Sequence, residues 1–427
     1  MRKGPLRHKW FALFTAATGL GSIADEVARL ALPLLVLDLT HSIAAAAILR
    51  VVQSLPYILF GAPAGALIDR VDKRRLLIAC DISGVALTVA IPLSAIGGVF
   101  SVELLYVIGF LLGTVEVLWG VTTDFSVVPS LVEEHELTDA NAIFLGADRG
   151  ARIIGPTLGG FAIAAIGNVN AMWIAALAFL PTLALFYLMP PILEISTQVA
   201  ALTVRNVIHE IGDGFAFVWR LKILRWLLVA MSIANFGGVG LRTLMLYVLR
   251  EEQHLDEVTI GLALSVGGAF TVFGSLLAPR LARGRPMGHS MIAVILASGL
   301  AALAGAFTND WRLITLCFTG RELAWQAFII YAFIPRQRDV PANMRGRANG
   351  AFRTVVLISN SASPAILSAI VVVASSAVAF AVAGAFAIAS AAVAAVTPLR
   401  DYAVREPDAS EAAETTRDEA VTASGEE

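Results

Sequence analysis

Charged side chains stand in the middle of long apolar stretches of this sequence, and they are the residues best suited to chemistry. Six of them form a candidate set for carrying a proton or contacting a substrate: Asp25, Glu26, Arg29, Glu116, Arg321 and Glu322. Asp25 and Arg29 are four residues apart, so on a helix they share a face and can form an ion pair. A carboxylate without a permanent partner can load and release a proton. A permanently paired carboxylate would instead hold helices together, and both interpretations stay open.

Four further charges lie inside the same stretches: Asp148, Arg149, Arg152 and Arg242. A charge at the centre of a lipid bilayer costs about 2.5–3.5 kcal/mol even on the gentler scales. If these stretches cross a membrane, each charge must therefore face the interior of a helix bundle or a water-filled cavity. For Arg29, Arg149 and Arg152 we expect structural ion pairs rather than a role in transport chemistry.

The composition indicates that these stretches do cross a membrane. The chain has 427 residues, of which 57% are apolar and only 15% are charged, against about 25% charged in a soluble domain. A membrane helix needs about 20 predominantly apolar residues. Twelve stretches reach this length, at about residues 10–37, 43–68, 76–98, 102–123, 141–166, 170–190, 224–249, 257–282, 288–307, 311–334, 348–373 and 376–397. The sequence therefore predicts an all-α membrane protein with twelve transmembrane helices.

The positive charges predict which way the chain is inserted. Of the 31 Lys and Arg residues, 22 fall in segments that share one side of the predicted membrane, whereas the opposite side holds only Arg250 and Arg312. Cytoplasmic loops carry such an excess, so both termini are expected in the cytoplasm and the protein in the inner (plasma) membrane. The apolar pattern resumes after the first basic segment, from Val27 to Leu37, so we expect an attached first helix rather than a cleaved signal peptide.

The organisation is predicted to be six helices plus six. Residues 1–190 form an N-terminal six-helix bundle and residues 223–399 a C-terminal one. Residues 191–222 connect them and include an amphipathic helix expected on the inner membrane surface. Residues 400–427 are polar and acidic, which is typical of a disordered tail.

The two halves share a spacing. Asn141 precedes Pro156 by fifteen residues in the first half, and Asn349 precedes Pro364 by fifteen in the second. Each pair falls on the fifth helix of its half. Parallel repeats of this kind are one of the known transporter plans, so the spacing favours two six-helix pseudo-repeats.

The segment after the second stretch carries a family resemblance. It reads Gly65-Ala-Leu-Ile-Asp69-Arg70-Val-Asp72-Lys73-Arg74-Arg75. This resembles the major-facilitator signature G-x-x-x-D-R-x-G-R-R-(R/K), with Asp72 in place of the usual glycine. The form D-R-x-D-(K/R)-R-R is similar to the drug–proton antiporter branch that includes macrolide efflux proteins and the enterobactin exporter.

That resemblance implies a conformational latch on the cytoplasmic side, where the second, third and eleventh helices meet. Asp69 would pair there with arginines of the eleventh helix, Arg353 among them, in one conformation only. The residues assigned to this latch are Gly65, Asp69, Arg70, Asp72, Arg74, Arg75 and Arg353. The alternative is a plain basic loop that only sets the orientation of the chain.

The fifth stretch carries a second motif. Gly155-Pro156-Thr-Leu-Gly159-Gly160 follows Arg152 and resembles the core of the antiporter signature G-P-x-x-G-G, without its upstream glycines. Glycines allow two helices to approach closely, and a proline bends a helix. Ordinary small-residue packing is the alternative to a role specific to exporters.

Other chemistry finds no support in the sequence. There is no Walker A loop and no dinucleotide-binding fingerprint. The six histidines are scattered, and the two cysteines have no metal-ligand spacing. We therefore expect no enzyme activity, no metal, no cofactor and no nucleic-acid partner.

The resulting hypothesis is a monomeric, proton-driven exporter of an amphiphilic small molecule, such as a drug, a natural product or a siderophore, working by alternating access. Its partners would be that substrate, protons and the lipid bilayer. Two alternatives remain open. One is a proton-coupled importer of a metabolite, and the other is a transporter-like membrane sensor or scaffold that transports nothing.

Overall fold

The computed structural model of the chain is built of helices. It describes residues 5–68, 71–123, 127–133, 136–189, 204–283, 285–341 and 344–403. Each of the twelve stretches predicted from the sequence falls mostly on one helix or on consecutive helical segments within these ranges, and residue 190 lies outside them. An all-α architecture is therefore confirmed for the described part of the chain.

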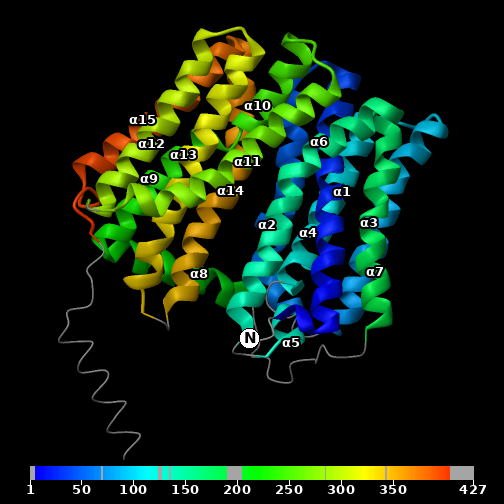
Figure 1. Cartoon of the computed structure of the whole chain (residues 1–427), viewed down its shortest axis with the longest axis horizontal. Helices are drawn as coiled ribbons and strands as arrows, with labels where there is room; N and C mark the ends of the chain where they lie inside the picture. The colour runs from blue at the N-terminus through cyan, green and yellow to red at the C-terminus, as the bar shows by residue number, and fades with distance from the viewer. Residues whose placement is uncertain are drawn as a thin grey trace, which may run out of the picture.

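The helices gather in two groups, here called the first and second lobes (Figure 1). The first lobe comprises η1 (Pro5–Arg7), α1 (Lys9–Thr40), α2 (Ile43–Ile68), α3 (Lys73–Ile96), α4 (Val102–Thr122), α5 (Val128–Leu131), α6 (Leu137–Leu177) and α7 (Phe179–Leu188). The predicted amphipathic connection contains α8 (Val204–Arg220). The second lobe comprises α9 (Lys222–Gly238), α10 (Leu241–Tyr247), η4 (Val248–Glu252), α11 (Glu257–Leu281), α12 (Met287–Ala304), η5 (Gly305–Phe307), α13 (Trp311–Arg338), α14 (Arg345–Val373) and α15 (Ser376–Val396).

The helices are long and apolar enough to cross a membrane several times. Nine spans among the described residues meet that description by length and composition, and one of them, Asp139–Leu188, runs for 50 residues. Gly167 divides this span, because its backbone has φ 81°, a conformation that side-chain-bearing residues rarely adopt. The chain is thus a multi-pass membrane protein, and the full count of twelve crossings stays a prediction.

Six helices in the described part of the chain begin at a side chain that accepts a hydrogen bond from the backbone of the first turn. These N-caps are Ser42 of α2, Asp72 of α3, Ser101 of α4, Asp256 of α11, Asp310 of α13 and Ser375 of α15. Such a cap is worth about 1 kcal/mol. The pKa of Asp256 lies below its usual value, because the Thr259 hydroxyl and backbone N–H both donate to its carboxylate.

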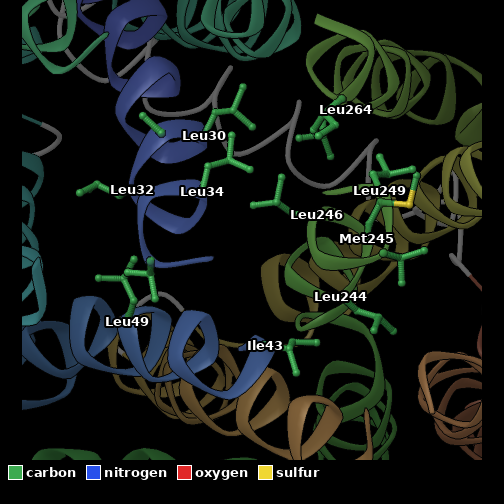
Figure 2. Close-up of a cluster of buried hydrophobic side chains, with 14 of the residues drawn as sticks. Leu30, Leu32, Leu34, Ile43, Leu49, Leu244, Met245, Leu246, Leu249 and Leu264 are labelled. Carbon is green, nitrogen blue, oxygen red and sulfur yellow. The ribbon is translucent and has the colours of Figure 1, made fainter. Parts of the chain in front are cut away.

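Two ends of the molecule can be told apart. The basic end holds the start of α1, the α2–α3 connection and α8, and the far end holds the α1–α2 and η4–α11 connections (Figure 1). At the far end one buried apolar cluster includes side chains of both lobes. In Figure 2, Leu30 and Leu34 of α1 lie across from Leu246 and Leu249 of the second lobe. The far end is therefore closed by a core that the two lobes share.

The basic end is built differently. One cluster there contains only residues of the first lobe, around Phe14 and Phe186. The other lies in the second lobe with α8, around Phe328 and Tyr331. At this end Arg7 contacts Glu133 and Glu136 within the first lobe, and Tyr402 contacts Asp339 within the second. Among the described residues, the shared apolar core thus lies at the far end, whereas each lobe has a core of its own at the basic end.

Ion pairs between the lobes reinforce the far end. Arg250 of η4 contacts Asp38 of α1 at 3.0 Å, and it also contacts Glu257 of α11 at 2.7 Å. His41, which follows α1, lies 3.2 Å from Glu251. Opening the far end would have to break both of these contacts between lobes.

The closest approach between the lobes lies between α6 and α11. A Cβ atom on Gly160 would collide with the backbone carbonyl of Glu257, and one on Gly261 would collide with the carbonyl of Pro156. The Thr157 hydroxyl and the Ser265 hydroxyl are 2.7 Å apart at the same contact. Gly160, the last glycine of the predicted motif, is thus a contact residue between the two lobes.

Replacing Gly160 by alanine should lower the melting temperature of the purified protein by several degrees, because overpacking a close contact costs about 1–3 kcal/mol. Gly146 lies on the same helix, and a Cβ there meets no atom within 4 Å. Gly146→Ala should therefore leave the melting temperature unchanged or raise it, since alanine favours a helix interior over glycine. Equal effects of the two substitutions would contradict the close approach.

Candidate functional site

A buried carboxylate on α1 lies at the centre of the charged side chains. The side chain of Glu26 is 1% exposed, and the Arg242 guanidinium on α10 donates to it at 2.8 Å. Arg152 of α6 lies 3.6 Å away and Arg29 of α1 lies 3.7 Å away. A single carboxylate of the first lobe is thus surrounded by three arginines, one of which belongs to the second lobe.

The glycine motif of α6 makes room for this carboxylate. A Cβ atom on Gly155 would lie 2.5 Å from the Cβ of Glu26, and one on Gly159 would lie 3.3 Å from the Cα of Val27. These glycines let α6 press directly against α1 at the level of the carboxylate. Pro156 follows within the helix and provides no backbone N–H. The motif therefore positions Glu26 as well as the contact between lobes.

Two further carboxylates share one arginine. Arg29 donates to Asp25 at 2.8 Å, the ion pair that the four-residue spacing allows, and to Glu116 of α4 at 2.6 Å. In contrast to Glu26, the Asp25 side chain is 45% exposed and that of Glu116 is 49% exposed. These two carboxylates have one guanidinium between them, and both are open to solvent.

A second arginine, Arg152 of α6, also contacts two carboxylates and extends the network along this helix. Arg152 donates to Asp148 at 2.9 Å, and the Ser22 hydroxyl of α1 donates to the same carboxylate at 2.9 Å. Arg152 is thereby held between Asp148 and Glu26. The structural pairing expected for Arg29 and Arg152 is present, whereas Arg149 is exposed and has no ion pair among the described residues.

The network borders a solvent-accessible space within the bundle. Asp25 is the seventeenth of the 32 residues of α1, well away from both helix ends. The side chains of Arg152 and Arg242 are 42% and 50% exposed although they contact the buried Glu26. Charges at this depth cannot face lipid without a large cost. The space beside them is therefore expected to hold water or a polar part of a ligand.

A polar face of α2 also reaches this region and was not singled out from the sequence. Arg50, Gln53, Ser54 and Tyr57 have the spacing of one helical face. Arg50 is exposed, lies within electrostatic reach of Arg29, and has no carboxylate within ion-pair distance among the described residues. The spacing i, i+3, i+4, i+7 in an apolar helix was the signal that could have identified this face.

The hydroxyls of Ser54 and Ser361 join this face to the other lobe. Ser54 lies on α2 and Ser361 on α14, and their Oγ atoms are 2.6 Å apart. The contact lies near the middle of both helices. It is therefore a further polar link between the lobes, in addition to that of Glu26 with Arg242 and that of Thr157 with Ser265.

The remaining pair of the candidate set lies inside the second lobe. Arg321 and Glu322 of α13 form an ion pair with each other, and the Arg321 guanidinium lies 5.1 Å from the centroid of the Trp325 ring. A Cβ on Gly238 of α9 would collide with that guanidinium. No ion pair joins these two residues to the charges around Glu26 among the described residues. The structure thus brings together four of the six candidates and leaves this pair separate.

The residues assigned to the latch are only partly visible. Asp69 and Arg70 lie outside the described residues, and Gly65 falls near the end of α2. Asp72 caps α3, and Arg75 lies 3.4 Å from its carboxylate.

The remaining latch residues show no contact between the lobes. Arg74 donates to the carbonyls of Phe186 and Tyr187 at the end of α7. Arg353 is exposed on α14, with no ion pair to a described residue. A pair between Asp69 and the eleventh helix stays a prediction.

A cluster of His8, Glu133 and Glu136 at the basic end has the composition of a cation site. Arg7 occupies it instead, at 2.8 Å from Glu133 and 3.4 Å from Glu136. Burial would raise the pKa of Glu136, but the hydrogen bond with His8 and the charge of Arg7 outweigh it and lower this pKa. The cluster ties the start of α1 to the start of α6.

A comparison with known proteins identifies the family of this chain. The sequence model of the Major Facilitator Superfamily matches residues 10–364. The chain belongs to the major facilitator superfamily. Proteins of this superfamily are transporters, so the expectation of a transporter rather than an enzyme is confirmed, as is the family resemblance of the α2–α3 segment.

Within the superfamily, the chain is similar to named efflux proteins. It is 27% identical to the multidrug efflux pump Tap of Mycolicibacterium fortuitum over 375 residues, which cover 82% of this chain and 85% of that protein. It is 28% identical to the multidrug efflux pump Tap of Mycobacterium tuberculosis strain ATCC 25618 / H37Rv, over 83% of this chain and 84% of that protein. These similarities extend over most of both chains.

A solved structure shows the same fold. A bacterial homologue of the iron transporter ferroportin, crystallised in an inward-facing state, superposes with a TM-score of 0.71 at 16% identity. The superposition covers 90% of this chain and 98% of that one. The major facilitator fold predicted from the sequence is therefore confirmed.

Glu26 should contribute more to the free energy of unfolding than its neighbour Asp25. Glu26→Gln removes the charge that three arginines surround, and breaking a buried pair costs about 3–5 kcal/mol, with the lower end expected here because Arg242 is half-exposed. Asp25→Asn disrupts a pair that solvent reaches, worth about 0–1 kcal/mol. Thermal unfolding of the two purified variants checks this, and a larger loss in Asp25→Asn would contradict the assigned roles.

Proposed function

We propose that this transporter exports an amphiphilic small molecule, such as a drug, a natural product or a siderophore, in exchange for protons. The observation that carries the proposal is the ion pair between Glu26 of the first lobe and Arg242 of the second, at 2.8 Å. A carboxylate that loses its partner when the lobes part can be protonated on one side of the membrane. The similarity to proteins named multidrug efflux pumps supports export as the direction.

The proposed coupling follows from the geometry of this pair. In the arrangement described above, the lobes are joined at the far end and Arg242 faces Glu26. The guanidinium charge favours the carboxylate and so favours release of a proton toward the basic end. When the lobes separate at the far end, Arg242 would move away from Glu26, and the carboxylate could take up a proton there. Asp25 and Glu116, both exposed, would exchange that proton with solvent or yield to a bound substrate.

The orientation in the membrane is part of the same proposal. The excess of Lys and Arg supports a cytoplasmic position for the basic end and both termini, with the protein in the plasma membrane. The arrangement would then be open to the cytoplasm and closed to the outside. Alternation between this arrangement and one open at the far end would carry the substrate outward. The functional unit is proposed to be a monomer, since each lobe contributes to the site from one chain.

The coupling is tested with inverted membrane vesicles acidified inside by respiration. A transported macrolide, cationic dye or siderophore should draw protons out of the vesicles and reverse the quenching of a pH-sensitive dye. Glu26→Gln should abolish this response and Asp25→Asn should reduce it several-fold, with Arg312→Gln at the far end as the unaffected control. Transport that continues unchanged after the proton gradient is collapsed would rule out the antiport, and uptake in the opposite direction would favour a metabolite importer.

Alternating access is tested by linking the two lobes. The Ser54→Cys/Ser361→Cys double variant places two thiols where hydroxyls are 2.6 Å apart, in a background with Cys80 and Cys317 replaced by alanine. Oxidation should form a disulfide and stop transport, because the lobes can no longer move past each other, and reduction should restore it. Each single-cysteine variant should be insensitive to oxidation. Full transport by the cross-linked protein would contradict alternating access and favour a static scaffold.

A further inference from the structure

The corner between α8 and α9 carries a group of basic and aromatic side chains that transport chemistry does not use. Trp219 and Arg220 end α8, and Lys222 begins α9. Arg225 and Trp226 follow one turn later. These five residues are here called the α8–α9 corner. The corner lies at the basic end, at the level where the membrane span Lys222–Glu252 begins.

The guanidinium of Arg225 lies near two indole rings. Its Cζ atom lies 5.9 Å from the centroid of Trp219 and 5.5 Å from that of Trp226. Its Nε atom is buried, and among the described residues it has no hydrogen-bond acceptor. Arg225 also has no ion pair with any described residue. A buried donor of a charged group is costlier to leave without an acceptor than a neutral one, so this arginine can accommodate an anionic acceptor from outside the chain.

The surroundings of Arg225 are open on one side and anchored on the other. Val218 and Leu224 are buried in the core of the second lobe, and Leu221 packs against that core. The side chains of Arg220 and Lys222, which lie between these anchored residues in the sequence, are exposed. Trp219 is 55% exposed. The backbone thus fixes two cationic groups and one indole beside Arg225 on a single outward surface.

The corner also lacks negative charge. No acidic residue occurs between residues 214 and 250 of the sequence. Three positive charges within six residues therefore have no acidic neighbour in this stretch of the sequence. Tryptophan is enriched at the level of lipid headgroups, where its ring meets both the apolar and the polar phase. Clusters of Lys and Arg at the end of a membrane helix attract anionic lipids.

We propose that the α8–α9 corner binds the phosphate of an anionic phospholipid headgroup, such as phosphatidylglycerol. Arg225, near the two indoles, would present its planar fork to the phosphate oxygens. Arg220 and Lys222 add positive charge at the rim, and Trp219 contacts the region where the acyl chains begin. Since α8 connects the lobes and contributes to the core of the second lobe, the bound lipid would fix this connection to the membrane surface.

The test uses the full-length protein in a neutral detergent, titrated with dioctanoyl phosphatidylglycerol while the melting temperature is recorded. A ligand of the folded state raises the melting temperature, so a dissociation constant follows from the titration. Dioctanoyl phosphatidylcholine serves as the lipid without net charge, and inorganic phosphate as the free anion. The variants are Arg225→Gln, Arg225→Lys, the double variant Arg220→Gln/Lys222→Gln, and the control Arg285→Gln, an exposed arginine at the same end without an aromatic contact.

We expect phosphatidylglycerol to stabilise the wild-type protein by several degrees and phosphatidylcholine to have little effect. Each charge removed from the corner should weaken binding about five-fold, and Arg225→Lys should bind better than Arg225→Gln but less well than the wild type. Arg285→Gln should bind like the wild type.

Three results would overturn the proposal. These are equal stabilisation by both lipids, full binding by Arg225→Gln, or reproduction of the effect by inorganic phosphate alone. If Arg225→Gln does not fold, the double variant at the exposed positions decides between the same outcomes.

Discussion

A carboxylate buried in a membrane helix can persist only if the protein compensates its charge, and Glu26 imposes this constraint on its surroundings. Three arginines from three helices converge on it, and one of them comes from the other lobe. Compensation at such short range requires α1 and α6 to pack almost backbone to backbone, which Gly155 permits. The position of the two lobes relative to each other is thus tied to the solvation of a single side chain.

Both apolar and polar contacts hold the two lobes together. At the far end a shared hydrophobic core and the Asp38–Arg250 pair join them, and at mid-depth the links are Glu26–Arg242 and Ser54–Ser361. The basic end has a separate core in each lobe. A rigid movement of the lobes therefore meets discrete contacts that can break in order, which suits a molecule with two packed arrangements. The exposed carboxylates Asp25 and Glu116 lie beside these contacts through their shared partner Arg29.

Much of the fold could be predicted because the membrane restricts what a sequence can do. The helices can be placed without knowledge of their contacts. Three features suffice for this: apolar runs of a fixed length, an amphipathic segment with the period of a helix, and the excess of Lys and Arg on one side. The amphipathic segment is indeed a helix, α8 (Val204–Arg220). The sequence predicted only a gap between two membrane spans near Gly167. It could not predict the positive φ of this residue, because that angle depends on how the chain changes direction within α6.

The sequence by itself determined the membrane class, the family and the short list of charges that a bilayer makes costly. It could pair Asp25 with Arg29, because a helix brings residues four apart together. Only the tertiary structure decided that Glu26 is buried whereas its neighbour Asp25 is exposed, that Arg242 is its partner 216 residues away, and that Arg321 and Glu322 belong elsewhere. The physical reason is that local spacing fixes contacts along one helix, whereas contacts between helices depend on which faces pack together, and an apolar helix hardly distinguishes its faces.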